Sequence, residues 1–197
     1  MSSYIALFED EIRNLSHRPR LLFHACCGVC CVYPLLLLDE YFDVTIYYTN
    51  DNIYPEEEYD LRLRELERYL SIISYRNIGL VVPERNSPAF LQKLEPMAME
   101  KEGGRRCFSC YEMRIEESFR YAYEEGFEYC GTVMSVSGRK NADYINRIGS
   151  ECAAKYAPVK FLTEDFKKKG GQALNEKLNK ELDLYHQVYC GCPFSLR

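Results

Sequence analysis

The sequence has no excess of basic residues, no long apolar run and no start that resembles a leader peptide. Its 25 basic residues are outnumbered by 30 acidic ones, which gives a net charge of −5 and argues against a protein that coats nucleic acid through bulk electrostatics. The longest apolar run, at residues 32–38, is far too short to cross a bilayer. The charged start and apolar segment of a secretory signal are also missing. We therefore expect a cytoplasmic protein without membrane contact, whose cysteines stay reduced or bind metal.

Internal repeats, low-complexity segments and linkers are missing as well. A chain of 197 residues is long enough to bury one hydrophobic core without support from disulfides. These features predict a single domain that spans residues 1–197.

The pattern of apolar residues predicts strands that alternate with helices. The predicted strands cover residues 20–24, 43–48, 78–82, 128–134 and 159–162. One helix is expected after the loop that follows the first strand, and the others cover residues 55–70, 87–99, 107–125, 142–154 and 174–182. This alternation is typical of an α/β domain with a mainly parallel sheet flanked by helices. Such sheets carry their sites at the carboxyl ends of the strands, where we place the cysteine-rich loop of residues 26–31.

Cysteine is unusually frequent for a chain of this length, with ten copies. Most of them fall in three short groups, which are Cys26, Cys27, Cys30 and Cys31 after the first strand, Cys107 and Cys110 in a C-x-x-C motif, and Cys190 and Cys192 in a C-x-C motif. Cys130 and Cys152 lie inside a predicted strand and a predicted helix, and Cys31 starts an apolar helix. These three are expected to pack as small hydrophobic residues, so seven candidate metal ligands remain.

Seven thiols in three short loops indicate a redox metal site. A single C-x-x-C motif fits a redox dithiol or half of a zinc site. A tetrahedral zinc site would use only four of the seven thiolates. A [4Fe–4S] cluster also uses up to four, and the others can hold a second metal or serve as reactive thiols. We therefore expect an iron–sulfur site, with structural zinc and a purely thiol-based function as the alternatives.

Around these cysteines the sequence resembles the cobalamin-independent epoxyqueuosine reductases, the QueH family. The matching segments are HACCGVC at residues 24–30, NDNIYPEEEY at 50–59, RCFSCYEMR at 106–114, DFKKKGG at 165–171 and YHQVYCGCPFS at 185–195. They keep the order that the family has and extend over nearly the whole chain.

The resemblance implies reduction of epoxyqueuosine to queuosine at the wobble position of tRNA, with a [4Fe–4S] cluster and an adjacent mononuclear iron. It also implies a Rossmann-like fold of the PP-loop or HUP type. Residues 26–31 stand where that group has its Ser-Gly-Gly-x-Asp-Ser phosphate loop, so ATP use is not expected. Two further departures are Val29, where the family usually has proline, and residues 135–140, which replace a short Ser-Pro-x-Lys run.

Removal of an epoxide oxygen consumes two electrons and two protons and releases water. The reaction therefore needs an external electron donor and a Lewis acid or proton donor at the oxygen. Our hypothesis assigns the cluster to Cys27, Cys107, Cys110 and Cys190, and the second iron to Cys26, Cys30 and Cys192. The candidate catalytic proton donors are His24, Asp51 and Glu58, although a histidine that ends a buried strand is often packed and a carboxylate at a helix start is often a cap.

A wobble nucleotide has to leave the anticodon stack to reach an active site, and basic residues then hold the phosphates. The candidate substrate-binding residues flank the cysteine and glycine motifs and are Arg105, Arg106, Arg114, Lys167, Lys168 and Lys169. The alternative for each is a solvated surface position. The alternative functions are an iron–sulfur tRNA sulfur-transfer enzyme and a zinc-stabilised adaptor.

Overall fold

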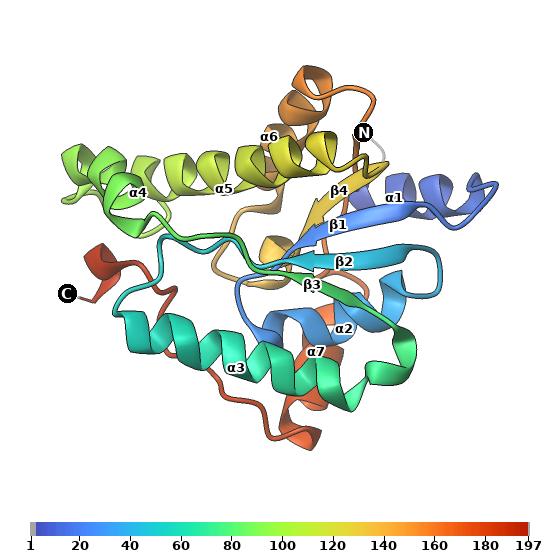
Figure 1. The fold of residues 1–197 in the computed structure, drawn as a ribbon, viewed down its shortest axis with the longest axis horizontal. Coiled ribbons are helices and arrows are strands. Elements are labelled where there is room, and N and C mark those ends of the chain that lie inside the picture. Colours follow the sequence, from blue (N-terminus) through green and yellow to red (C-terminus); the bar gives the residue numbers. More distant parts are fainter. Residues whose placement is uncertain (1–2, 197) are drawn as a thin grey trace.

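The computed structural model describes residues 3–196, and a five-stranded sheet forms its centre (Figure 1). The strands are β1 (Arg20–His24), β2 (Asp43–Tyr47), β3 (Gly79–Val81), β4 (Tyr129–Thr132) and β5 (Lys160–Phe161). They run in the order β3-β2-β1-β4-β5, and every neighbouring pair is parallel. The predicted α/β class with a parallel sheet is therefore confirmed.

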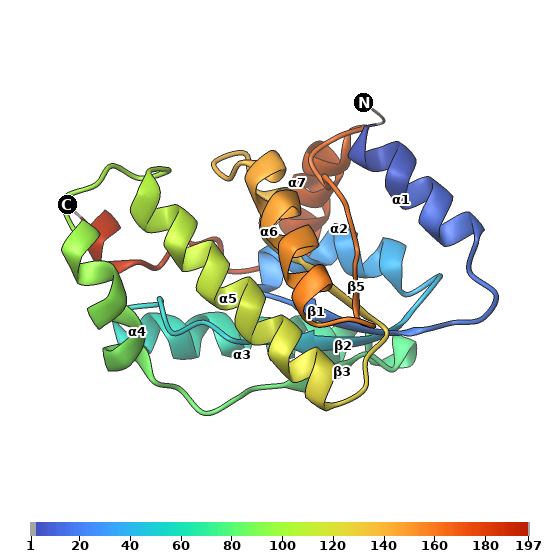
Figure 2. The ribbon, with the colours of Figure 1, turned by 90° about the horizontal axis from the view of Figure 1, so that it is seen from above.

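Helices cover both faces of this sheet. They are α1 (Tyr4–Arg13), α2 (Gly28–Leu38), α3 (Glu56–Ile72), α4 (Ser87–Leu94), α5 (Arg105–Glu124), α6 (Ala142–Lys155) and α7 (Gly171–Glu181), with the 3₁₀ turns η1 (Ser74–Arg76), η2 (Glu95–Met97), η3 (Val133–Val136) and η4 (Pro193–Ser195). Figures 1 and 2 show α5 and α6 on one face, and α2, α3 and α7 on the other. Within residues 3–196, none of the helices combines the length and the apolar character that crossing a bilayer requires.

Alternate side chains of β1 pack into two separate hydrophobic cores. Leu21 and Phe23 join the core beneath α2 and α3, whereas Leu22 joins the core beneath α5 and α6. All three are fully buried, as expected of a central parallel strand whose two faces are both covered. Burial of this apolar surface from water is the main stabilising term of the fold.

The central position of β1 brings distant loops to one edge of the sheet. His24 at its carboxyl end is in register with Tyr47 of β2 and with Thr132 of β4. The loops after β1, β2 and β4 therefore meet at this edge, and the loop after β1 carries the first cysteines.

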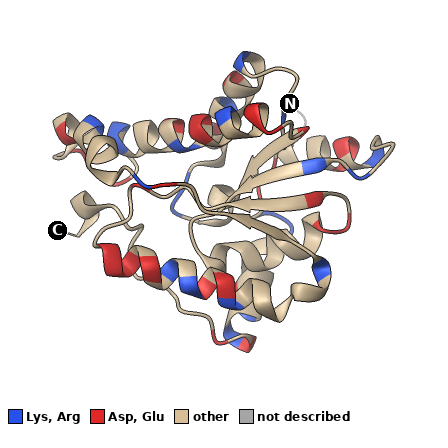
Figure 3. Cartoon of the chain, viewed as in Figure 1, with Lys and Arg blue, Asp and Glu red and all other residues tan. Residues whose placement is uncertain are grey.

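Charged residues of both signs alternate along the outer helices. Helix α3 begins with three glutamates and continues with arginine and glutamate side by side, and Figure 3 shows the same mixture along α5. Opposite charges three or four residues apart stabilise a solvated helix surface. Neither helix presents a continuous basic face.

Candidate active site

Three cysteines of the loop after β1 form one close group of sulfur atoms at the start of α2. Cys26, Cys27 and Cys30 have their Sγ atoms all within 4.8 Å of one another. The Cys27 and Cys30 sulfurs lie 2.8 Å apart, and those of Cys26 and Cys27 lie 3.7 Å apart. Three thiolates this close together can bind one metal ion or part of a cluster.

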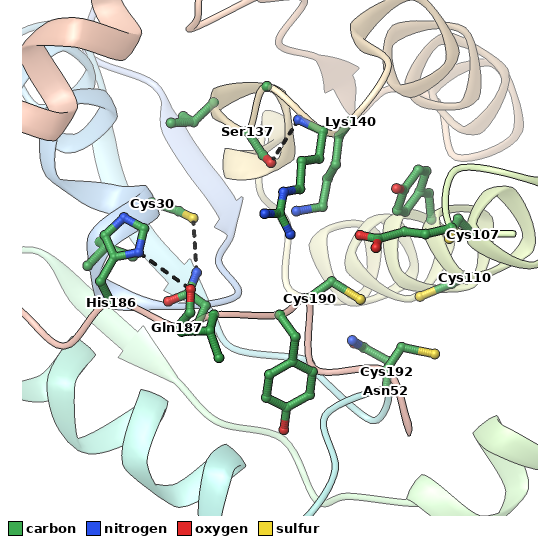
Figure 4. Close-up of a pocket in the computed structure, with 18 of the residues that line it drawn as sticks. Cys30, Asn52, Cys107, Cys110, Ser137, Lys140, His186, Gln187, Cys190 and Cys192 are labelled. Atoms are coloured by element: carbon green, nitrogen blue, oxygen red, sulfur yellow. Dashed lines mark hydrogen bonds between the residues drawn. The ribbon is translucent and has the colours of Figure 1, made fainter. Parts of the chain in front are cut away.

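The other four predicted ligands lie at the start of α5 and in the loop before η4. Cys107 and Cys110 are one turn apart on α5, and Gly103 N donates to Cys107 Sγ over 3.2 Å. Figure 4 shows the sulfurs of Cys110 and Cys190 facing one another, with Cys192 beside them. The seven predicted ligands thus fall into a group of three from the loop after β1 and a group of four from two later segments.

The three remaining cysteines lie outside both groups. Cys31 packs in the core beneath α2, and Cys130 and Cys152 pack in the core beneath α5 and α6. Burial raises the pKa of each of these thiols above its usual value. They are packing residues, in agreement with the sequence analysis.

Each sulfur group contains one thiol that ionises easily. Hydrogen bonds from Cys27 and Cys30 hold the pKa of Cys26 well below its usual range. In the second group, a hydrogen bond from Cys192 lowers the pKa of Cys190 to about 5. Burial raises the pKa of Cys27 to about 12, so that thiol keeps its proton until a metal displaces it. Cys26 and Cys190 therefore offer thiolates, the form of cysteine that can bind a metal, and a metal bound at Cys27 would displace its proton.

A buried arginine stands between the two sulfur groups. Arg114 is only 4% exposed, and its Nη2 donates to Asn50 Oδ1 over 2.6 Å and to His24 Nε2 over 3.0 Å. Burial alone would lower the pKa of Arg114, but the thiolates of Cys110 and Cys26 raise it above its usual value. Its positive charge therefore stabilises thiolates on both sides.

His24 is neutral and fully buried. Burial and the neighbouring Arg114 lower its pKa to about 3. Because Arg114 donates to Nε2, we assign the ring proton to Nδ1, which lies 2.8 Å from Thr132 Oγ1. Both ring nitrogens take part in hydrogen bonds, and the one at Nε2 holds the Arg114 guanidinium in place.

Glu58 and Asp51 also serve the framework around the site. The Glu58 carboxylate accepts from Arg62 Nε over 2.7 Å and from the Tyr185 hydroxyl over 2.9 Å. Asp51 accepts from Asn86 N over 2.9 Å, and burial raises its pKa. Like His24, both carboxylates lie outside the wall of the pocket described below.

Arg62 holds the loop that carries the C-x-C motif. It is 1% exposed and donates to Cys190 O over 3.2 Å and to Tyr189 O over 3.0 Å. Gly191 has a φ of +99°, and a Cβ atom there would lie 2.9 Å from the Ile53 side chain. The motif therefore needs glycine both for its backbone angle and for this close approach.

A pocket of about 540 Å³ lies between the two sulfur groups. Five of the seven cysteines line it, namely Cys30, Cys107, Cys110, Cys190 and Cys192. The wall also includes residues 136–140, one side of α7 and residues 186–189. Its other members are Val29, Asn52, Glu102, Arg106, Tyr111 and Arg114. This volume is within the usual range for small-molecule sites.

Lys140 is another cation of this pocket. Burial lowers its pKa, but the nearby sulfurs of Cys26 and Cys30 raise it by more, so the net direction is upward. Lys167 fixes the loop that carries it, since its Nζ donates to Ser135 O over 2.9 Å and to Lys140 O over 3.4 Å. The Lys140 ammonium therefore stays charged beside the first sulfur group.

Two asparagines of α7 clamp the first turn of α2. Asn175 Nδ2 and Asn179 Nδ2 both donate to Val29 O over 2.8 Å. In return, Tyr33 N donates to Asn175 Oδ1 over 3.0 Å. The turn held in this way carries Cys30, so α7 fixes the position of one predicted sulfur ligand.

A profile of the family described as "Epoxyqueuosine reductase QueH" matches residues 21–197. A relative of that name from Staphylococcus aureus is 34% identical over 183 residues, which cover 90% of this chain and 76% of the relative. The relative from Streptococcus pyogenes serotype M1 is 31% identical, with 92% and 72% covered. The relative from Acinetobacter baylyi is 32% identical, with 90% and 81% covered. The chain belongs to the QueH family.

Membership of the QueH family confirms the resemblance drawn from the cysteine motifs and makes the chain an oxidoreductase. The matched range contains both sulfur groups and the pocket between them.

The six basic residues predicted to bind substrate differ in how far they reach solvent. Arg106 is buried and donates to Ala98 O over 2.8 Å and to Glu100 O over 2.6 Å, while it also lines the pocket. Arg114 and Lys167 hold the site from within, as described above. The exposed members are Arg105, Lys168 and Lys169. Contact with RNA stays a prediction for the set.

Sequence reasoning missed several residues that build the site of this QueH member. They are Arg62, Asn175, Asn179 and Gln187. The two asparagines carried a usable signal, because a spacing of four residues places both on one side of a helix. Gln187 lies inside a family segment and was overlooked because glutamine carries no reactive group.

Proposed function

We propose that the chain reduces epoxyqueuosine to queuosine in tRNA, in the pocket between its two sulfur groups. The observation that carries the proposal is the convergence of five candidate cysteines from three segments on one pocket of a QueH family member, with Cys26 and Cys27 next to Cys30. The pocket has the volume for a modified nucleoside, and four basic residues line it, namely Arg106, Arg114, Arg139 and Lys140.

We infer that these cysteines bind a [4Fe–4S] cluster and a second iron. Soft thiolate ligands suit both groups, and seven sulfurs exceed what one four-coordinate metal uses. We keep the division in which Cys27, Cys107, Cys110 and Cys190 hold the cluster and Cys26, Cys30 and Cys192 hold the iron. The grouping by segment favours an alternative, in which the four sulfurs of the second group hold the cluster by themselves.

The bound centre would deliver electrons one at a time from an external donor and provide a Lewis acid. The chain's own residues bind and polarise the substrate. Since His24, Asp51 and Glu58 lie outside the pocket wall, we assign the cation that faces the developing negative charge on the epoxide oxygen to Lys140. A fixed ammonium in a water-poor site stabilises such a charge strongly.

Anaerobic purification followed by metal and sulfide analysis tests the cofactor. We expect about five irons or fewer for each chain, together with acid-labile sulfide and a brown colour. A parallel assay with epoxyqueuosine-containing tRNA should yield queuosine when a reductant is supplied. Stoichiometric zinc without sulfide, or consumption of ATP during turnover, would contradict the proposal and favour the adaptor or the sulfur-transfer enzyme.

Two alanine variants distinguish the two divisions of the cysteines. If Cys192 binds the second iron, Cys192→Ala should lose one iron and keep all sulfide, whereas Cys27→Ala should lose the cluster. If the cluster belongs to the second group alone, the two outcomes should be reversed.

A further inference from the structure

Gln187 places its side-chain amide against the first sulfur group. Its Nε2 lies 3.0 Å from Cys27 Sγ and 4.0 Å from Cys30 Sγ, and Figure 4 shows the amide reaching toward Cys30 from the loop that leads to Cys190. The side chain lines the pocket. A contact between amide N–H and sulfur is a direct route by which the protein can tune a metal–thiolate centre.

The oxygen of this amide is buried and makes no hydrogen bond to the described residues. Gln187 Oε1 is inaccessible to solvent and has no hydrogen-bond partner within residues 3–196. Only the nitrogen of an amide can donate to a sulfur, so the oxygen has to be the end left unpaired. Buried carbonyl oxygens are nearly always hydrogen-bonded, and an idle one in a ligand pocket points to a donor on the ligand.

Two other pocket residues repeat the pattern. Asn52 Oδ1 and Asn179 Oδ1 are also buried without a partner among the described residues, and both side chains line the pocket. Three residues of the wall therefore contain an amide oxygen that lacks a hydrogen-bond donor in the described part of the chain. Such a wall suits a ligand rich in N–H and O–H groups, which describes a deazaguanine nucleoside that carries an amine-linked, hydroxylated ring.

We propose that Gln187 is a positioning residue that links substrate binding to the sulfur group. Its Oε1 accepts a hydrogen bond from an N–H or O–H of the substrate, while its Nε2 donates to the Cys27 sulfur. This inference rests on the proposed function, because it takes the pocket to be the nucleoside site and the cysteines to be metal ligands.

The link between the two ends is the conjugation of the amide group. When the oxygen accepts a hydrogen bond, the N–H becomes a stronger donor, as in any hydrogen-bonded chain. A stronger N–H···S bond stabilises electron density on the sulfur and therefore favours the reduced centre. The bound substrate thus raises the reduction potential of the centre, and electrons enter more readily once the substrate is in place.

Two substitutions separate the two ends of the amide. Gln187→Leu removes both hydrogen bonds, so we expect KM to rise about tenfold, as for loss of one hydrogen bond, and the potential to fall and to stop responding to substrate. Gln187→Glu keeps an acceptor but loses the donor, so KM should rise less while the potential falls in the same way. Gln92→Leu, on the α4 helix away from the pocket wall, is the matched control.

The measurements are redox titrations of the loaded protein with and without epoxyqueuosine-tRNA, and tRNA binding to the metal-free protein. Metal-free Gln187→Leu should bind that tRNA about tenfold more weakly, whereas tRNA with unmodified guanine at the wobble position should not distinguish it from wild type. An unchanged potential in both variants, or a wild-type potential that does not respond to substrate, overturns the inference. If wild type binds the modified tRNA but does not reduce it, the proposed function fails, while the comparison of potentials still tests the contact between Gln187 and sulfur.

Discussion

Glu164 lies just before the lysine-rich segment, and its carboxyl group is almost completely buried. It accepts from Asp165 N over 2.6 Å, and burial raises its pKa from 4.5 to about 7. The folded state therefore binds this proton more tightly than the unfolded chain does. It follows that the free energy of unfolding falls as pH rises from about 4.5 to about 7.

Glu164→Gln keeps the shape of the side chain and removes its titration. At about 1.4 kcal/mol for each pKa unit, the wild type should lose about 3 kcal/mol more than the variant between pH 4.5 and pH 7. Urea unfolding of the metal-free protein at several pH values measures this difference. Glu151→Gln, at an exposed position of α6, should follow the wild type. Parallel curves for Glu164→Gln and wild type would show that this carboxyl is already ionised below pH 5.

The cysteines assigned to packing offer a second test at single residues. Cys130→Ala and Cys152→Ala should keep the full content of iron and sulfide, because both side chains lie in the core beneath α5 and α6. The cost should be limited to about 1 kcal/mol of stability for the small cavity at Cys130. Cys107→Ala is the comparison and should lose the cluster. A colourless Cys130→Ala or Cys152→Ala protein that remains folded would mean that the ligand set is wrong.

The role of a residue could be predicted from the sequence only where the type of side chain and its spacing already indicate a particular chemistry. Cysteine groups with short spacings stand out in any position. The role of Arg114 could not be found this way. An arginine beside a C-x-x-C motif suggests a phosphate ligand, whereas the fold buries it in hydrogen-bond contact with His24. Gln187 and Lys140 depend on loops whose course the sequence does not specify.

At the scale of elements, helix α3 acts as the support of the C-x-C loop. Arg62→Met should remove the two bonds to the loop carbonyls and leave the partly buried Glu58 without its cation. Loss of one partner of a buried pair costs about 3 kcal/mol or more, and Cys190 should bind metal poorly. We therefore expect lower iron content and a lower unfolding temperature.

The matched control for this change lies on the same helix. Arg64 is exposed, so Arg64→Met should preserve both iron content and stability. If Arg62→Met retained full iron, the loop would be held by the metal alone and the ion pair would be dispensable.

The elements themselves were largely predictable, because the apolar periodicity of the five strands and of the long helices is strong. All five predicted strands exist. The predicted helix over residues 87–99 divides into α4 and η2, since Pro96 supplies no backbone N–H for a continuous helix. Helix α1 was not predicted, although Ser3 caps it and Phe8 anchors it in the core. The final residues of the fourth predicted strand form the turn η3 instead.

At the scale of the whole molecule, recognition of tRNA has to work on a chain with net negative charge. Lys168 and Lys169 are exposed beside the pocket loop, whereas Lys167 is tied into that loop. The double variant Lys168→Ala, Lys169→Ala should bind tRNA more weakly. Its salt dependence should be flatter by about 0.7 to 0.9 in the logarithmic slope for each phosphate that the two lysines neutralise in the wild type.

Iron content should not change in this double variant. Lys167→Ala serves as the contrast, since it should disturb Lys140 and lower turnover with little change in the salt slope. Binding titrations at several salt concentrations measure both effects. An unchanged affinity and slope in the double variant would leave the RNA surface to be found elsewhere.

The topology explains why fold and site were predictable to different degrees. A parallel sheet with β1 at its centre collects the loops after β1, β2 and β4 at one edge, so the general place of the site follows from the order of elements alone. The pocket wall also needs α7 and the segment that follows it, which return to the same edge. Their path depends on side-chain contacts such as the hydrogen bond from Asn175 to Val29 O. Such contacts do not produce a periodic pattern of apolar residues in the sequence.

The clamp between α7 and α2 also makes one backbone amide a reporter of motion. Tyr33 N–H donates to the Asn175 side chain of another helix, so its exchange with solvent deuterium requires α7 to move away. The rate of hydrogen exchange at this amide would therefore report how often the pocket wall opens. Metal loading, which fixes Cys30 on the same turn, should slow that exchange, and Asn175→Ala should speed it selectively relative to the later turns of α2.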